Sequence, residues 1–286
     1  MDKPILFLTT LAARYLPGSV KSALYRYPPF ARRIRDQLNR SLENDLVVVE
    51  IAGGELAGMS MQLNLQSEKD YWLGTYEPEL LRVVKDLVEP GMVAYDVGAN
   101  IGYISLLMAR CVAPTGMVFS FEPLPENLER LDRNLELNQL TKVVQDVPSA
   151  VIDASREVDF QIGPSGGTGK ASGSAGRQNL SYSRTISVPG LSLDEFIMRE
   201  NHPPPQVVKI DVEGGETLTL PGMRRTLWEF QPALLLELHG PEAAEVAWHE
   251  LTEAGYRVCK MSAGYPTVHS IDLLEWKAYL VALSRA

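Results

Sequence analysis

Residues 93–103 read Val-Ala-Tyr-Asp-Val-Gly-Ala-Asn-Ile-Gly-Tyr, and residues 119–123 read Phe-Ser-Phe-Glu-Pro. The first segment has the pattern of a buried strand, a tight glycine-rich turn and the start of a helix. The second has the pattern of another strand, with an acid where that strand ends. Together they are typical of the first half of a nucleotide-binding βαβ unit. The two segments therefore predict an open α/β sheet.

The spacing within the turn distinguishes between kinds of nucleotide ligand. A dinucleotide-binding turn reads Gly-x-Gly-x-x-Gly, so that a pyrophosphate can approach the helix N-terminus. Here Asn100 stands between Gly98 and Gly102, in the place of the second glycine. Asp96 could hold a cationic or amino-acid group, and Glu122, 20 residues past Gly102, could accept both ribose hydroxyls. An amino-acid end, a sulfonium and an adenosine fit this pattern, which favours S-adenosylmethionine.

Composition places the chain among globular proteins. It has 286 residues, of which 45% are hydrophobic and 22% charged. Cys111 and Cys259 have no C-x-x-C partner, which argues against a zinc knot or a disulfide framework and favours buried thiols in a reducing compartment. No apolar run is long enough for a membrane span, and the short run at residues 5–8 lacks the features of a signal peptide. We therefore predict a cytoplasmic protein.

The charge of the chain is unevenly distributed. The net charge of −9 argues against bulk binding of nucleic acid. Residues 1–45 nevertheless carry eight Lys/Arg and four Asp/Glu, a local charge of +4, which leaves −13 for the rest. This basic segment could be a solvated helix face, or a docking surface for an acidic partner, a membrane face or another copy of the chain. Its clustered arginines are Arg26, Arg32, Arg33, Arg35 and Arg40.

The pattern of apolar and turn residues divides the chain into regions. Residues 1–45 are predicted to be helical, and residues 46–66 alternate like a β-hairpin around Gly53-Gly54. We therefore expect an N-terminal helical arm and hairpin over 1–66 and a doubly wound α/β domain over 67–286.

Within the α/β domain, strands and helices are expected to alternate. No helical pattern separates the last two strands, which predicts an antiparallel hairpin at the sheet edge. The strands are expected near 92–96, 117–122, 142–147, 206–211, 233–238, 256–260 and 278–283, and the helices near 77–88, 102–112, 125–138, 192–200, 215–229 and 241–254.

One segment interrupts this alternation. Residues 163–176 contain six glycines and three serines. They could form a linker, or a lid loop that approaches a ligand closely. Lys170 within the segment and Arg177 beside it could then bind an anionic group of a substrate.

Ionisable residues gather where two predicted strands end. Asp211 and Glu213 follow one strand, and Glu237 and His239 end the next. His239 could act as a general base toward a hydroxyl nucleophile, or Asp211, Glu237 and His239 could bind Mg²⁺ or Mn²⁺ and lower the pKa of that hydroxyl. Alternatively, Glu213 and Glu216 could serve only the N-terminus of the following helix.

These segments resemble the FkbM-type methyltransferases over about residues 70–260. The resemblance rests on 96–103, on Phe121-Glu122-Pro123 and above all on 209–216, which read Lys-Ile-Asp-Val-Glu-Gly-Gly-Glu. It implies a Rossmann-like seven-stranded methyltransferase sheet in the order 3-2-1-4-5-7-6, preceded here by an N-terminal helical and hairpin extension.

The resemblance also implies sites and an activity. An entry segment including Tyr76 and Glu77 would cover the donor, and Ser149 and Ala150 would lie near the adenine. The family typically methylates hydroxyls of sugars and secondary metabolites, with some members acting on nitrogen. The remaining donor contacts would be Asp96, Gly98, Asn100, Gly102, Glu122 and Pro123.

We therefore expect an enzyme that methylates an oxygen of a saccharide or secondary metabolite with S-adenosylmethionine. Three alternatives remain open at this point. They are an N-methyltransferase with the same donor site, a donor-binding regulatory module without catalysis, and a nicotinamide-dependent oxidoreductase, which Asn100 and the missing third glycine disfavour.

Overall fold

The computed structural model describes residues 46–163, 169–176, 182 and 184–284. Two compact units can be distinguished. The first comprises the described residues up to Pro78 together with 136–138, and the second comprises Glu79–Leu135 and the described residues from Gln139 onward. The boundary predicted after residue 66 falls within the first unit. The predicted helical arm over 1–45 lies outside the described residues.

The first unit contains a β-hairpin. Strands β1 (Val47–Glu50) and β2 (Ser60–Leu63) pair antiparallel, as the alternation of their residues predicted. Val47 and Val49 are buried while the residues between and after them are exposed. A short helix, α4 (Lys69–Leu73), follows and ends at Gly74 in the left-handed conformation.

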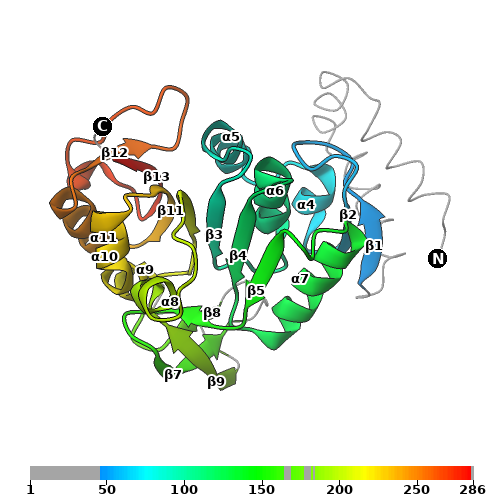
Figure 1. The fold of residues 1–286 in the computed structure, drawn as a ribbon, viewed down its shortest axis with the longest axis horizontal. Helices are drawn as coiled ribbons and strands as arrows, with labels where there is room; N and C mark the ends of the chain where they lie inside the picture. Colours follow the sequence, from blue (N-terminus) through cyan, green and yellow to red (C-terminus); the bar gives the residue numbers. More distant parts are fainter. Residues whose placement is uncertain (1–45, 164–168, 177–181, 183, 285–286) are drawn as a thin grey trace, which may run out of the picture. The chain divides into compact units, whose positions relative to one another are not determined.

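The second unit is built on a main sheet (Figure 1). Within the described residues its strand order is β12-β13-β11-β10-β3-β4-β5, with β13 antiparallel to both of its neighbours and the other pairs parallel. In chain order this is 3-2-1-4-5-7-6, so the expected fold and the antiparallel edge are confirmed. The strands are β3 (Val93–Val97), β4 (Met117–Phe121), β5 (Val144–Val147), β10 (Val207–Ile210), β11 (Ala233–His239), β12 (Tyr256–Lys260) and β13 (Lys277–Ser284).

Helices cover both faces of the main sheet. Figure 1 shows α6 (Tyr103–Val112) and α7 (Pro125–Leu137) on one side of β3 to β5, and α8 (Leu193–Met198) and α11 (Pro241–Glu253) on the other. Because the parallel strands are covered on both faces, they are apolar almost throughout. The core includes Tyr95 and Phe119 from the strands and Phe196 from α8, whose rings pack edge to face.

The helix predicted over 215–229 is divided. It comprises α9 (Glu216–Thr219), a 3-10 turn (Pro221–Met223) and α10 (Arg224–Glu229). The interruption falls at Pro221, which lacks a backbone donor. The helix resumes as α10. In its first turn, the backbone N–H groups of Arg225 and Thr226 donate to the Asp194 carboxylate.

A second, smaller sheet was not predicted. Its strands are β6 (Ala150–Val151), β7 (Arg156–Ile162), β8 (Gly169–Ala171) and β9 (Arg184–Leu191), in the order β6-β9-β7-β8. Part of the segment predicted as a glycine-rich loop is therefore a strand. Gly169 pairs with Ile162, and a side chain on Gly169 would lie 2.3 Å from the ring of Phe160. The glycine at this position allows the two strands to approach.

Two expectations from composition can be compared with the described part of the chain. None of its helices has the length and apolar character that crossing a membrane requires. Cys111 and Cys259 are both free thiols. Cys259 is buried as expected, whereas Cys111 is only half-buried.

Candidate functional site

The glycine-rich turn at the end of β3 lies between two other strand ends. The backbone N–H groups of Gly98 and Ala99 both donate to Phe121 O at 3.0 Å, which ties the turn to the end of β4. Gly98 has φ +77°, and a Cβ there would lie 1.9 Å from Asp211 O. The turn therefore also packs directly against the segment that follows β10.

Asp96 lies beneath this turn in a buried ion pair. Its Oδ1 is 3.1 Å from Lys209 Nζ, and its Oδ2 accepts a 2.6 Å hydrogen bond from Ser105 Oγ. Lys209 Nζ in turn donates to Gly98 O at 2.8 Å. The cationic group that Asp96 contacts is thus the lysine of the neighbouring strand. Lys209 was not predicted to have a role. A lysine between Val208 and Ile210 in an apolar strand nevertheless indicates a buried cation that needs a partner.

Glu122 follows β4 and holds the other side of the turn. Its buried carboxylate accepts from Asn100 N at 2.8 Å, Leu124 N at 3.0 Å and Asn127 Nδ2 at 3.1 Å. Burial raises the pKa of Glu122 although these hydrogen bonds and Lys209 oppose the shift. A carboxylate is therefore held at the strand end where a ribose-binding acid was expected.

The other predicted donor contacts lie in two places. Glu122 N and Ser149 N both donate to Val147 O, at 3.1 and 2.8 Å, so the segment with Ser149 and Ala150 lies beside Glu122. Tyr76 and Glu77 belong to the first unit, where Tyr76 packs edge to face on Tyr71. The remaining predicted residues are Gly102 at the start of α6 and Pro123, which is half-buried.

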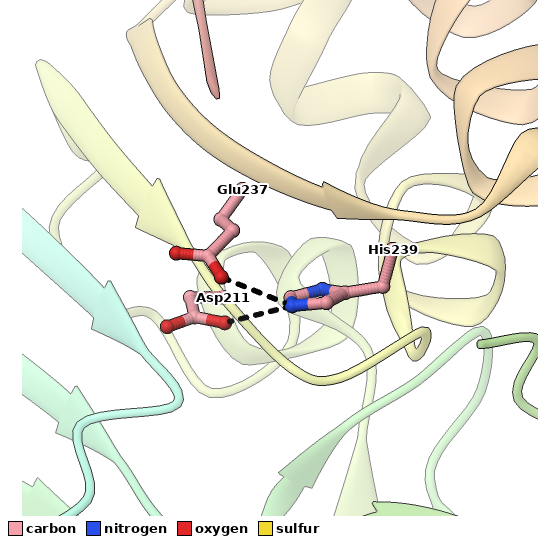
Figure 2. A group of neighbouring side chains, drawn as sticks. All are labelled: Asp211, Glu237 and His239. Carbon is pink, nitrogen blue, oxygen red and sulfur yellow. Dashed lines mark ion pairs between the residues drawn. The ribbon is translucent and has the colours of Figure 1, made fainter. Parts of the chain in front are cut away.

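The four predicted catalytic residues come together around one imidazole ring. His239 Nε2 lies 3.0 Å from Glu237 Oε1, 3.8 Å from Glu213 Oε2 and 4.0 Å from Asp211 Oδ1. Figure 2 shows the Asp211 and Glu237 side chains directed at the same ring nitrogen. On the opposite side of the ring, Nδ1 is 3.0 Å from Glu216 Oε1.

The register of the sheet explains this convergence. Ile210 pairs with Leu236 across the parallel strands β10 and β11, so Asp211 and Glu237 follow at the same level. Glu237 and His239 share a face of β11 because side chains alternate along a strand. Glu216 reaches the ring from the first turn of α9 and is fully buried. Glu216 therefore contacts His239, one of the predicted catalytic residues, in addition to lying at a helix start.

The acids control the protonation of the cluster. Burial lowers the pKa of His239, but its contacts with Glu216 and Glu237 outweigh this effect and raise the pKa to about 10. Burial raises the pKa of Asp211 to about 7, a shift that the charge of Lys209 opposes and that of Glu237 reinforces. For Glu237, the hydrogen bonds from His239 and Lys277 outweigh burial and lower the pKa to about 2. The acids around the ring therefore favour the protonated form of His239.

Two residues of the last strand region complete the cluster and were missed from sequence. Lys277 contacts Glu237 Oε1, and the ring of Trp276 lies edge-on to His239 with centroids 6.1 Å apart. Lys277 is the register partner of His239 on antiparallel β13. Only the order of the strands brings it here, so no local sequence motif marked it.

The glycine-rich segment packs against the same loop. The Lys170 side chain is buried, and its Nζ donates to Ala175 O at 2.9 Å. Ala175 N donates to Gly214 O at 3.0 Å, directly after Glu213. Lys170 thus holds residues that contact the Glu213–Gly214 turn. Arg177, the other predicted substrate contact, lies outside the described residues.

Several known methyltransferases are similar to this chain. The hexuronic acid methyltransferase AglP of Haloferax volcanii is 27% identical over 189 residues, which cover 65% of this chain and 73% of that protein. A protein-L-isoaspartate O-methyltransferase of Methanothrix thermoacetophila is 39% identical over 61 residues, covering 21% of this chain and 29% of that one. The solved structure of an FkbM methyltransferase from Methylobacillus flagellatus KT has a TM-score of 0.43 at 16% identity. That match covers 77% of this chain and spans about half, 53%, of the other.

The family comparison decides the class of protein. The sequence model of the FkbM methyltransferase domain matches residues 96–258, which is more than half of the chain. This range begins at the buried acid beneath the glycine-rich turn and includes Glu237, His239 and the other three acids around the ring, Asp211, Glu213 and Glu216. The chain belongs to the FkbM methyltransferase family and is an S-adenosylmethionine-dependent methyltransferase.

Proposed function

We propose that the protein transfers a methyl group to a hydroxyl oxygen of a saccharide or secondary metabolite. The observation that carries this proposal is the position of the acidic cluster. The glycine-rich turn at residues 98–102, which we call the donor turn, packs through Gly98 on the backbone of Asp211. The side chain of Asp211 faces His239. Groups that can accept the proton of an acceptor hydroxyl therefore lie next to the predicted donor site.

The residues present fit S-adenosylmethionine, which supplies an electrophilic methyl group on its sulfonium when bound. Glu122 offers a carboxylate to the ribose hydroxyls, and the backbone of Gly98 and Asn100 gives a close approach above the buried Asp96–Lys209 pair. We assign the adenine to the segment at Ser149 and Ala150. The further donor contacts that we assign in the second unit are Gly102 and Pro123. The donor contacts expected of Tyr76 and Glu77 in the first unit stay predictions.

The cluster favours a hydroxyl acceptor over an amine acceptor because only the hydroxyl needs a group that takes up its proton. Methyl transfer needs donor, methyl and acceptor in line, and an amine needs only its neutral form to react. A hydroxyl must in addition lose its proton. Asp211, whose pKa is raised to about 7, can accept this proton as a general base, and His239 can do so once its own proton has passed to Glu213 or Glu237. Alternatively, part of the cluster can bind a cation that lowers the pKa of the hydroxyl.

A saccharide acceptor is supported by the similarity to the hexuronic acid methyltransferase AglP of Haloferax volcanii. An acidic sugar carries a carboxylate, and we assign Lys170 and Arg177 to such an anionic group. The Lys170 ammonium already donates to Ala175 O, so an acceptor would share or displace this hydrogen bond.

The proposal is tested by incubating the protein with isotopically labelled S-adenosylmethionine and a panel of neutral sugars, hexuronic acids, polyhydroxylated metabolites and amines. Mass spectrometry then identifies the labelled atom. We expect label on a hydroxyl oxygen. Label confined to amine nitrogen would support the N-methyltransferase alternative. His239→Gln should lower turnover without changing the affinity for the donor.

We also propose a cytoplasmic location, which the two free cysteines support. The docking role of the basic segment 1–45, toward an acidic partner or a second copy of the chain, stays a prediction. So does the absence of nucleic-acid binding, which rests on the net charge of −9.

A further inference from the structure

We propose that Asp211, Glu237 and His239 form a binding site for one divalent cation, of the kind that accepts both oxygen and imidazole ligands. The inference rests on the proposed function, because such a cation would act on the acceptor hydroxyl. It goes further by naming the ligands, the residue that orients them and the class of ion.

The three side chains converge as a ligand set would. Each offers one ligand atom, and these atoms all lie within 4.8 Å of one another. Figure 2 shows that Asp211 and Glu237 approach the ring of His239 from the ends of neighbouring strands. Glu237 and His239 lie within β11, and Asp211 directly follows β10. Side chains on or next to strands are positioned more precisely than those on long loops.

The buried acids still have unsatisfied oxygens. Glu237 is only 5% exposed, and among the described residues its Oε2 has no hydrogen-bond partner, while Lys277 contacts its Oε1. Oε2 of Glu216, which is also fully buried, has no hydrogen-bond partner there either. Buried carboxylate oxygens nearly always have a partner in native proteins. A cation among these side chains would supply one to Glu237.

Glu216 provides the support that a histidine ligand requires. Its Oε1 lies 3.0 Å from His239 Nδ1, so it can accept the Nδ1–H and leave Nε2 to face the cation. A carboxylate that fixes the tautomer and orientation of a ligating histidine is a recurrent feature of metal sites. The helix-start acid of the sequence pattern would thus be the residue that orients the ligand.

The local charge favours a cation. Four carboxylates, those of Asp211, Glu213, Glu216 and Glu237, lie within 4.0 Å of the imidazole nitrogens. Without a cation, Lys277, Lys209 and the proton on His239 offset only part of this charge. Carboxylates gathered at this density repel one another unless positive charge lies between them.

The donor types indicate which ion fits. Two carboxylates and one imidazole suit Mn²⁺, since carboxylates favour hard ions and the nitrogen ligand favours a transition metal. Three protein ligands leave coordination positions for water and for an acceptor hydroxyl. On such an ion the hydroxyl proton becomes more acidic and is released to solvent or to a nearby carboxylate.

The experiment is a calorimetric titration of the full chain, stripped with EDTA and dialysed, with MnCl₂ and separately with MgCl₂. Electron paramagnetic resonance of free Mn²⁺ gives an independent binding curve. We expect one saturable Mn²⁺ site per chain. Asp211→Asn, Glu237→Gln and His239→Gln should each weaken Mn²⁺ binding at least about 10-fold. Glu216→Gln, which keeps all three ligands, should weaken it roughly 10–100-fold.

The matched control is Glu245→Gln, the same chemical change at an exposed position of α11, which should leave Mn²⁺ binding unchanged. Circular dichroism confirms that each variant is folded, and the wild-type titration decides the question even if a ligand variant does not fold. Each sample is also titrated with S-adenosylmethionine in EDTA. Donor binding without saturable Mn²⁺ or Mg²⁺ binding would overturn the cation site and leave the proposed function intact. Mn²⁺ binding that survives all three ligand substitutions would overturn it as well. Failure of the donor to bind would instead count against the proposed donor site.

Discussion

At the scale of single residues, Glu122 links the donor turn to the end of β4. We predict that Glu122→Ala weakens binding of S-adenosylmethionine by roughly 10–100-fold, because hydrogen bonds to a charged group contribute about 1.5–3 kcal/mol. Calorimetric titration measures the change. Glu126→Ala is the control, since Glu126 lies in the first turn of α7 and is exposed. A folded Glu122→Ala protein with unchanged donor affinity would show that the ribose binds elsewhere.

The same carboxylate predicts how donor binding depends on pH. Burial raises the pKa of Glu122, so it becomes protonated at a higher pH than an ordinary glutamate. Protonation removes the charged acceptor, and donor affinity should therefore decline as the pH falls through this raised pKa. Stability changes in the opposite direction. The folded form binds this proton more readily than the unfolded chain does, so the cost of burying the charge is relieved at lower pH.

Donor titrations between about pH 5 and 8 measure this effect, with a reference pKa near 4.3 for an ordinary glutamate. Glu122→Gln should remove the part of the pH dependence that belongs to this group. If the wild type and the variant showed parallel pH profiles, the titrating group would have to be another residue.

The buried pair Asp96–Lys209 permits a stability prediction. Lys209→Met leaves the fully buried Asp96 carboxylate without its cation, and loss of one partner of a buried pair typically costs about 3–5 kcal/mol. The double variant Asp96→Asn/Lys209→Met should be closer to the wild type than Lys209→Met alone. Urea unfolding measures both free energies of unfolding. Strictly additive losses would mean that the two side chains are not coupled.

The residues of the site differed in how far sequence could predict them. Asp96, Glu122, Asp211 and His239 could be named because ligands bind beyond the carboxyl ends of parallel strands, and a strand end is visible in a sequence. Lys277 could not, because it enters through antiparallel pairing with a strand about 40 residues away. The protonation of His239 likewise depends on acids from separate elements.

At the scale of elements, the turn after β3 packs so closely on the segment after β10 that one added methyl group should disturb the contact. Gly98→Ala would place a Cβ 1.9 Å from Asp211 O, so the turn after β3 and the segment after β10 would have to separate. We predict a loss of donor affinity of more than about 10-fold and a lower free energy of unfolding. The first is measured by calorimetry and the second by urea titration.

Gly264→Ala is a closely matched control. Gly264 has the same φ of +77°, but nothing lies within 4 Å of a Cβ built there. It should therefore incur only the cost of a left-handed alanine, about 1–2 kcal/mol. The difference between the two variants isolates the contact between the loops. Equal losses would show that the backbone conformation alone, and not this contact, determines the effect.

The elements of the main sheet were predicted more completely than those of the small one. Strands β3, β10 and β11 are mostly apolar runs between clear helices, and the family resemblance supplied their order. In the small sheet, β6 has two residues and β8 three, too few for any periodicity to appear. The glycines around β8 indicated a loop. In the structure Gly169 is part of β8, and its lack of a side chain lets β7 pack closely against it.

At the scale of the whole molecule, the proposed donor site brings together elements that are distant in sequence. The turn after β3 and Glu122 after β4 lie in the first half of the chain, and Lys209 enters from β10. Unfolding of the second unit must separate these parts. Binding of the donor at this point should therefore stabilise that unit as a whole, not one loop of it.

This coupling predicts a thermal shift. A ligand at about 100 times its Kd stabilises the folded state by about 2.7 kcal/mol, which for a unit of this size raises the Tm by roughly 5–10 °C. Scanning calorimetry with increasing S-adenosylmethionine measures the rise. NADH at the same concentrations should leave the Tm unchanged, because Asn100 replaces the glycine that a pyrophosphate needs. Glu122→Ala should lose most of the shift produced by the donor. If NADH raised the Tm and S-adenosylmethionine did not, the turn after β3 would bind a dinucleotide, and the assignment of the donor to Glu122 would be wrong.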